Sequence, residues 1–226
     1  MNEIRAITLD LDNTLWDLMP TLERAEANSY ALLRQIYPNV TERYSVRQIQ
    51  DLRQDIFESM PQIRHDLTEV RRQVFTRMLT ACDYGLDGVD ALMQRFLHDR
   101  NQLTLYPDSL SALKILHGRY PLVSLSDGNS DLEKVGIRDY FVGCVYAADV
   151  GVMKPHQAGF LKACEIAKTQ PRETLHIGDS PDSDIDGARN AGLQTMWMRR
   201  YSETWVKDYQ PDFTVTSMAE AVDILC

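Results

Sequence analysis

The sequence predicts an α/β fold in which a parallel sheet core is interrupted by an all-helical insert. Short apolar runs rich in β-branched residues recur along the chain, and from residue 106 onward they alternate with helical patterns. Strands that alternate with single helices form parallel sheets. Between residues 17 and 105 the strand patterns are missing. We therefore expect residues 1–16 and 106–226 to form a Rossmann-like core, and residues 17–105 to form a helical domain inserted after the first strand.

The elements of the core follow from their apolar patterns. The strands are expected at AITLDL (6–11), PLVSLS (121–126), GCVYAA (143–148), TLHIGD (174–179), LQTMWM (193–198) and DFTVT (212–216). Helices are expected over 111–118, 156–168, 183–192 and 217–225. The ends of two of them are marked, because Gly118 can close the first and Ser217 can cap the last.

The insert reads as four helices at about 21–37, 45–59, 65–82 and 89–102, separated by Pro38, Pro61, Gly85 and Gly88. Every lysine of the chain lies outside the insert, whose cationic residues from Arg24 to Arg100 are all arginines. A solvated helix surface is the usual role for such charges. The alternative is that one or two of these arginines meet an anionic or planar ligand, which a guanidinium suits better than an ammonium.

Composition excludes several classes of partner. With 226 residues, 44% of them hydrophobic, the chain can bury a sizeable core. The formal net charge of −9 argues against nucleic acid as the main partner. A small phosphate can still bind where a metal ion or local cations neutralise the site.

The cysteines, the N-terminus and the apolar runs indicate where the protein is located. The cysteines show no CxxC pair, the N-terminus lacks the apolar stretch of a signal peptide, and no run approaches the roughly 18 apolar residues of a membrane span. We expect a cytoplasmic globular protein that is not bound to membranes. Monomer and homodimer both stay open.

Polar residues follow three of the expected strands. Asp10 and Asp12 end the first strand, Ser126 ends the second, and Asp179 ends the strand TLHIGD. Ligands of parallel α/β sheets bind beyond the carboxyl ends of the strands. We therefore expect these side chains to meet at one edge of the sheet, although they lie far apart in sequence.

Asp10 and Asp12 are two residues apart, so in an extended segment both side chains point the same way. Two close carboxylates need a cation between them or a proton on one of them. A metal-bound Asp10 is a candidate nucleophile, and Asp12 is a candidate general acid/base. Asp179 and Asp184 add oxygen ligands of the kind that Mg²⁺ prefers.

Each of these features is weak alone. A DxD pair such as Asp10 and Asp12 is more often a turn or a helix cap. A lysine before proline, as at Lys154, is usually solvated, and a serine at a strand end, as at Ser126, usually forms a hydrogen bond with the backbone. Their order and placement together carry the inference.

The motifs DLDNTL, LSDGN, GVMKP and GDSPDSDIDGARNAG resemble, in this order, the four motifs of haloacid dehalogenase-like phosphohydrolases. The match spans the whole predicted core. The position of the helical insert is similar to that of the family's cap domain, between the first and second motifs.

The resemblance implies a hydrolase that acts on phosphomonoesters. Asp10 would attack phosphorus and form an aspartyl-phosphate, while Asp12 would protonate the leaving alkoxide and then activate water. Ser126, with the backbone of Asp127 and Gly128, would hold the phosphoryl oxygens. Lys154 would neutralise charge on the nucleophile and the phosphate.

The resemblance also implies a magnesium site. The ligands would be the Asp10 carboxylate, the Asp12 backbone carbonyl and Asp179. Asp184 would support them directly, through water or through Lys154. Ser180 and Asp182 are expected to be loop residues.

Asp127 departs from the family pattern, in which Asn usually follows the strand. A second carboxylate pointing into a phosphate pocket would repel the substrate. We therefore expect its side chain to point away from the pocket and its backbone to do the binding.

The resemblance leaves the reaction to be chosen among dehalogenases, phosphatases and mutases. Asp12 argues against a dehalogenase, because a halide leaving group needs no acid. A mutase is disfavoured only by the cap. The alternative from a different class is a noncatalytic binding or regulatory module, which would be expected to lack Asp10 or Lys154.

The substrate is indicated only by local resemblance. The segment HDLTEVRRQVF (65–75), together with the first two motifs, is similar to a flavin mononucleotide (FMN) hydrolase subgroup that also dephosphorylates a ribitylaminouracil phosphate. This implies a small-molecule phosphomonoester on a polyol or ribose-like chain, with or without a planar heterocycle. Other sugar phosphates and nucleoside monophosphates stay open.

Overall fold

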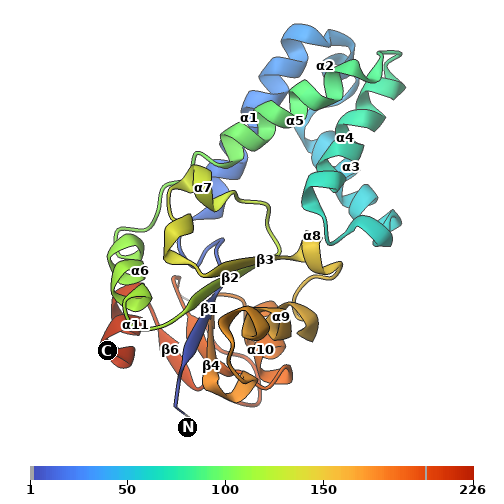
Figure 1. Ribbon diagram of the computed structural model, residues 1–226. Coiled ribbons are helices and arrows are strands. Elements are labelled where there is room, and N and C mark those ends of the chain that lie inside the picture. Colours follow the sequence, from blue (N-terminus) through green and yellow to red (C-terminus); the bar gives the residue numbers. More distant parts are fainter. Residues whose placement is uncertain (1–2, 202) are drawn as a thin grey trace.

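The computed structural model describes residues 3–201 and 203–226 (Figure 1). Its centre is a six-stranded sheet in the order β3-β2-β1-β4-β5-β6, and every neighbouring pair is parallel. The strands are β1 (Ala6–Leu9), β2 (Leu122–Ser126), β3 (Gly143–Tyr146), β4 (Thr174–Gly178), β5 (Gln194–Met198) and β6 (Phe213–Val215). The predicted α/β class with a parallel sheet is confirmed.

Strand β1 lies in the middle of the sheet. Its register pairs Leu9 with Ser124 of β2 on one side and with Ile177 of β4 on the other. The carboxyl ends of three strands therefore reach the same edge, and the residues that follow them are neighbours in space.

Helices cover both faces of this sheet. The core helices are α6 (Ser109–His117), α7 (Leu132–Val135), α8 (Ala147–Val150), α9 (Gln157–Ala167), α10 (Asp186–Asn190) and α11 (Met218–Leu225). On β2, Leu122 packs in one hydrophobic cluster with α6 and α11, whereas Val123 packs in another with α9 and α10. Successive strand residues point to opposite faces, so both faces of the sheet are buried.

Two core segments differ from the sequence prediction. The strand expected over 143–148 ends at Tyr146, and residues 147–150 form the short helix α8. The helix expected over 183–192 begins differently in the structure. A wider π-helical turn spans Pro181–Ile185, and the α-helix α10 begins only at Asp186. In this turn the Asp184 carboxylate accepts a hydrogen bond from the Ser180 backbone N–H, and the carboxylate lies under the end of β4.

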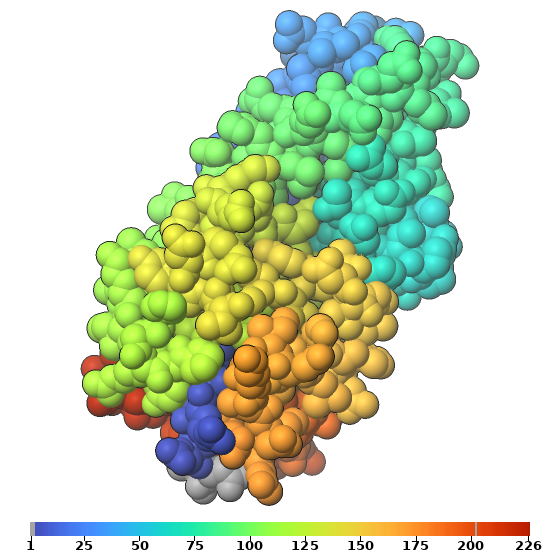
Figure 2. Space-filling view, viewed as in Figure 1, coloured from blue at the N-terminus to red at the C-terminus, as the bar shows by residue number. Residues whose placement is uncertain are grey.

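The segment between β1 and β2 is helical. It contains α1 (Leu18–Ile36), α2 (Pro38–Arg43), α3 (Val46–Ser59), α4 (Leu67–Ala81) and α5 (Val89–Arg100). These helices bury their own apolar cluster, from Ala25 to Phe96. Figures 1 and 2 show them as a lobe beside the α/β core. We call residues 17–105 the helical segment; these limits stay a prediction.

Local capping explains the helix starts of this segment. The Asp17 side chain accepts from the Met19 N–H and begins α1, and Ser45 forms a capping box with Gln48 at the start of α3. The sequence predicts only a break at Pro38, whereas this residue opens α2, because proline suits the first turn of a helix. Across the part of the chain that the structure describes, no helix has the length and apolarity needed to span a membrane.

Candidate active site

Asp10 stands directly after the central strand and is 5% exposed. Its backbone N–H donates to the Ile177 carbonyl, which continues the β1–β4 pairing by one residue. Its two carboxylate oxygens accept from different donors: Thr14 Oγ1 at 3.0 Å and Lys154 Nζ at 2.6 Å. The candidate nucleophile is therefore held in place by a hydroxyl and an ammonium.

Lys154 joins Asp10 to Asp184. Its Nζ lies 2.6 Å from Asp184 Oδ1, and both side chains are buried. Asp184 also accepts from the Ser180 backbone N–H, and its Oδ1 lies 3.1 Å from His176 Nε2. The Asp184 side chain can lie close to the end of β4 because residue 178 is a glycine: a Cβ there would lie 2.3 Å from Asp184 Cγ.

Asp10, Asp179 and Asp184 form a carboxylate cluster. One oxygen from each can be chosen so that all three lie within 4.8 Å of one another. All three ligand atoms are carboxylate oxygens, which Mg²⁺ prefers. The residues present therefore fit a divalent cation.

The electrostatics of the cluster favour such a cation. Burial, reinforced by the charges of Asp184 and Asp179, raises the pKa of Asp10 well above its ordinary value, although Lys154 opposes the rise. Burial and the Asp184 charge raise the pKa of Asp179 to about 7. A single lysine does not balance three carboxylates, so a bound cation would relieve the remaining repulsion.

The charged state of the Lys154–Asp184 pair follows from the same contacts. Burial alone would lower the pKa of Lys154, but the neighbouring carboxylates outweigh it and hold this pKa above its usual range. Burial alone would raise the pKa of Asp184, but Lys154 and the His176 hydrogen bond hold it below its usual range. Burial lowers the pKa of His176, which favours a neutral ring.

Asp12 faces a different set of donors. Trp16 Nε1 donates to its Oδ1 at 2.7 Å, and Arg100 Nη2 lies 2.7 and 2.8 Å from its two oxygens. Arg100 is the last residue of α5, so this contact links the helical segment to the core. The two carboxylates of the DLD motif therefore have separate partners, Lys154 for Asp10 and Arg100 for Asp12.

The turn after β2 supplies the other predicted residues. Ser126 is buried, and its Oγ accepts from the Gly128 N–H at 3.0 Å. The Asp127 carboxylate accepts from the Lys154 backbone N–H at 2.9 Å, and burial raises its pKa against the opposing charge of Lys154. Asp127 thus holds the loop that carries Lys154. Asn129 Nδ2 donates to Thr68 Oγ1 of α4 at 3.1 Å, a second link to the helical segment.

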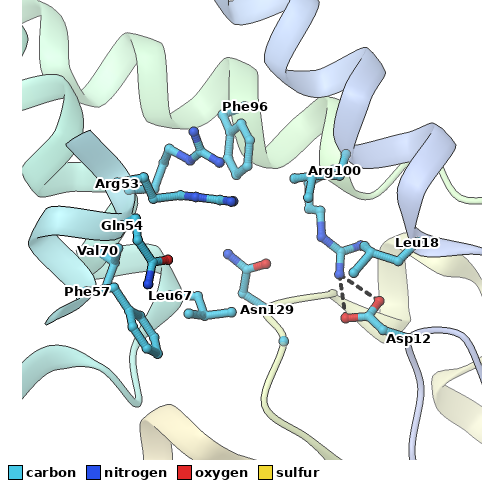
Figure 3. Close-up of a pocket in the computed structure, with 13 residues that line it drawn as sticks. Asp12, Leu18, Arg53, Gln54, Phe57, Leu67, Val70, Phe96, Arg100 and Asn129 are labelled. Atoms are coloured by element: carbon cyan, nitrogen blue, oxygen red, sulfur yellow. Dashed lines mark hydrogen bonds and ion pairs between the residues drawn. The ribbon is translucent and has the colours of Figure 1, made fainter. Parts of the chain in front are cut away.

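A cavity of about 250 Å³ opens above this turn, between the core and the helical segment (Figure 3). Its apolar lining consists of Leu18, Leu22, Phe57, Leu67, Val70 and Phe96. Its polar lining consists of Asp12, Arg53, Gln54, Arg71, Arg100 and Asn129, with Gly128 below. Figure 3 shows Arg53 and Asn129 extending into the same space.

The structure brings the predicted site residues to one edge of the sheet: Asp10, Asp12, Ser126, Asp127, Gly128, Lys154, Asp179 and Asp184. Ser180 and Asp182 lie in the turn before α10; the Ser180 hydroxyl accepts from the Ser183 N–H, and Asp182 pairs with Lys207. Sequence reasoning did not single out Trp16, Arg100, Asn129 and His176. The only signal among them was the all-arginine charge of the insert, which included Arg100.

Replacing Gly128 by Ala is expected to lower kcat/KM and to leave the melting temperature nearly unchanged. An added Cβ would lie 2.4 Å from Asp12 Oδ2, so the carboxylate has to shift from its present position. A displacement of about 1 Å in a reacting group can cost roughly 100-fold in rate. We expect kcat/KM for the reaction at this site to fall by about this factor, with a melting temperature close to that of the wild type.

Gly85→Ala is the matched control, because no atom lies within 4 Å of an added Cβ there. Unchanged kcat/KM in Gly128→Ala, or an equal loss in the two variants, would show that the Asp12 carboxylate does not depend on the space beside Gly128.

Comparison with known proteins agrees with this geometry. The family model of haloacid dehalogenase-like hydrolases matches residues 4–192. The 5-amino-6-(5-phospho-D-ribitylamino)uracil phosphatase YigB of Escherichia coli (strain K12) is 29% identical over 233 aligned residues, covering 100% of this chain and 98% of that protein. The pyrimidine 5'-nucleotidase YjjG of the same organism is 35% identical over 129 residues, covering 54% of this chain and 57% of that protein.

A solved structure extends the likeness to the whole fold. The crystal structure titled 2-haloacid dehalogenase from Pseudomonas syringae pv. Tomato DC3000 superimposes with a TM-score of 0.92 at 31% identity, covering 98% of each chain. The family match, the aligned relatives and the shared fold lead to one conclusion: this chain belongs to the haloacid dehalogenase-like hydrolase family.

Proposed function

We propose that the protein is a Mg²⁺-dependent phosphatase that hydrolyses small-molecule phosphomonoesters through an aspartyl-phosphate on Asp10. The observation that supports this most strongly is the pair of differently partnered carboxylates. Asp10 contacts the Lys154 ammonium and lies near two further carboxylates, while Asp12 stands beside it at the wall of the cavity. A nucleophile and a separate acid/base are what phosphomonoester hydrolysis requires.

In the first step a carboxylate oxygen of Asp10 bonds to phosphorus while the bond from phosphorus to the leaving oxygen breaks. Asp12 gives its proton to that oxygen, and the alcohol departs. In the second step Asp12 takes a proton from water as the water oxygen attacks phosphorus, which releases inorganic phosphate and restores Asp10. Lys154, Ser126 and the backbone of the turn after β2 would hold the phosphoryl oxygens.

Asp10, Asp179 and Asp184, with the Asp12 backbone carbonyl, are the groups that would hold the Mg²⁺ ion or support its ligands. A divalent cation at this place supplies charge stabilisation for the transferring phosphoryl group. The protein's own part is to keep the carboxylates ionised and in place, which Lys154 and the Ser180 N–H do for Asp184.

Dehalogenation is the second candidate reaction, because the Pseudomonas syringae structure carries that title. A halide leaves without a proton, so a dehalogenase has no use for a second carboxylate facing the leaving group. Asp12 is present and held by two donors. The arrangement therefore favours a phosphate ester over a haloacid.

The cavity supports a substrate whose leaving group has an apolar or planar part. Phe57 and Phe96 provide aromatic surface, while Arg53 and Gln54 provide donors for carbonyl or hydroxyl oxygens. FMN and a ribitylaminouracil phosphate fit this description, and the second agrees with the name of the Escherichia coli relative. Nucleoside monophosphates and other sugar phosphates are the alternative.

The test is a panel of phosphomonoesters with Mg²⁺: p-nitrophenyl phosphate, FMN, the ribitylaminouracil phosphate, a pyrimidine nucleoside monophosphate and a sugar phosphate, together with a 2-haloacid. Phosphate release is expected, with the largest kcat/KM for an ester that carries a planar ring. Better turnover of the nucleotide would select the alternative substrate class. Halide release alone, or no release from any compound, would contradict the proposal.

A further inference from the structure

We propose that Arg100 is a positioning residue of the reaction. From the end of the helical segment, it holds the Asp12 carboxylate in the orientation that gives a proton to the leaving group. The inference rests on the proposed function, because it concerns the acid/base of that reaction.

The contact between Arg100 and Asp12 restrains both carboxylate oxygens. Arg100 Nη2 lies 2.7 Å from Oδ1 and 2.8 Å from Oδ2 (Figure 3). Trp16 Nε1 donates a further hydrogen bond to Oδ1 at 2.7 Å. The Arg100 side chain is 4% exposed and that of Asp12 is 17% exposed. Oδ1 accepts from both Trp16 and Arg100, so the side chain keeps its orientation while Oδ2 carries the proton that goes to the leaving oxygen.

The end of α5 is itself fastened to the core. Asn101 follows Arg100, and its side chain accepts from the Asp131 N–H at 2.7 Å while donating to the Leu97 carbonyl at 2.7 Å. Helix α5 is also tied to α1, because Asn28 Nδ2 donates to Asp99 Oδ2 at 3.0 Å. Arg100 is therefore held at the junction between the helical segment and the core.

A purely structural role does not explain the presence of Arg100. Among the described residues, Arg100 Nη1 is one of four buried side-chain polar atoms with no hydrogen-bond partner. A buried N–H without a partner lowers stability, so packing alone does not favour a guanidinium at this place. The guanidinium is better explained by what it does to Asp12 than by its own packing.

The chemistry of the leaving group shows what this orientation is for. An alkoxide is a poor leaving group, so breaking its bond to phosphorus requires the proton from Asp12. p-Nitrophenolate is stable as an anion and leaves without that proton. A misplaced Asp12 should therefore slow the transfer from alkyl esters and leave the transfer from p-nitrophenyl phosphate nearly unchanged.

The experiment measures kcat/KM, which reports on the first transfer step, in Arg100→Met and Arg100→Lys. The substrates are p-nitrophenyl phosphate and the alkyl phosphate of the panel that the wild type hydrolyses fastest. General-acid catalysis contributes about 100-fold or more. We expect Arg100→Met to lose about 100-fold on the alkyl ester and less than about 5-fold on p-nitrophenyl phosphate. Arg100→Lys should recover part of the loss, because the native contact uses a single nitrogen.

Retained p-nitrophenyl phosphate activity in these variants also reports an intact fold. Arg95→Met is the matched control: Arg95 lies on the same helix, is half-exposed and pairs with Asp99 instead of Asp12. It is expected to keep the wild-type ratio of the two substrates.

Two results separate the inference from the proposed function. If the wild type hydrolyses the esters but both Arg100 variants lose equally on the two substrates, or lose nothing, Arg100 does not position Asp12 and the phosphatase assignment stands. If the wild type releases no phosphate from any ester, the proposed function is wrong and the inference is wrong with it.

Discussion

Replacing Asp10 by Asn is expected to lower phosphate release from p-nitrophenyl phosphate by at least about 1,000-fold, because an amide cannot form the acyl phosphate. The substitution keeps the size of the side chain and its place beside Lys154. Loss of activity would therefore report the missing nucleophile. The measurement is kcat/KM with Mg²⁺ present, using protein purified in parallel with the wild type.

The same variant should be more stable than the wild type when no metal is present. Burial and the neighbouring carboxylates raise the pKa of Asp10, which means that its charge is unfavourable in the folded protein. Asn removes that charge, while Lys154 keeps Asp184 as its partner. We expect a higher melting temperature for metal-free Asp10→Asn, together with its loss of activity.

Asp139→Asn is the control, because this exposed carboxylate lies outside the site. It should match the wild type in both measurements. Wild-type activity in Asp10→Asn would refute the aspartyl-phosphate. Low activity combined with a lower melting temperature would point instead to damage of the fold.

The residues whose position the sequence could predict are those whose place depends on the sheet; their roles stay a prediction. Asp10, Ser126 and Asp179 each follow or end an apolar strand, and parallel strands bring their carboxyl ends to one edge. Local sequence therefore contained enough information to place them. The parallel sheet itself could be predicted for the same reason, since β-branched runs alternate with helical patterns.

The residues that the sequence did not reveal depend on how the helical segment docks. Arg100 lies 88 positions after its partner Asp12, and it looked like one arginine among many on a solvated face. The Asn129–Thr68 contact has the same origin. His176 was missed for another reason: a histidine inside an apolar strand gives no sign that it will meet Asp184 across a turn. Docking and side-chain pairing are tertiary properties, so the periodicity of one segment cannot show them.

Removal of the metal is expected to have the second large effect. With EDTA in excess, phosphate release should fall by at least about 100-fold, because Lys154 alone would have to offset the charge of the phosphate and of three carboxylates. Activity should return when Mg²⁺ is added back. Full activity in excess EDTA would contradict a metal-dependent mechanism.

Binding of Mg²⁺ should also depend on pH, with a sign that follows from Asp179. Its pKa in the metal-free protein is raised to about 7, so at lower pH a proton occupies a carboxylate that the metal needs. The apparent Kd for Mg²⁺ should change little above about pH 8 and should rise at least about tenfold per pH unit below about pH 6. Titration calorimetry without substrate measures this directly, and the increase in melting temperature caused by Mg²⁺ should be larger at about pH 8 than at about pH 6. Asp179→Asn should bind Mg²⁺ more weakly, because a neutral amide oxygen attracts the cation less than a carboxylate oxygen does. A Kd that is constant across this range in the wild type would contradict the raised pKa of Asp179. A Kd unchanged in the variant would mean that Asp179 is not a ligand, and the ion would then have to be held by Asp10 and Asp184 without it.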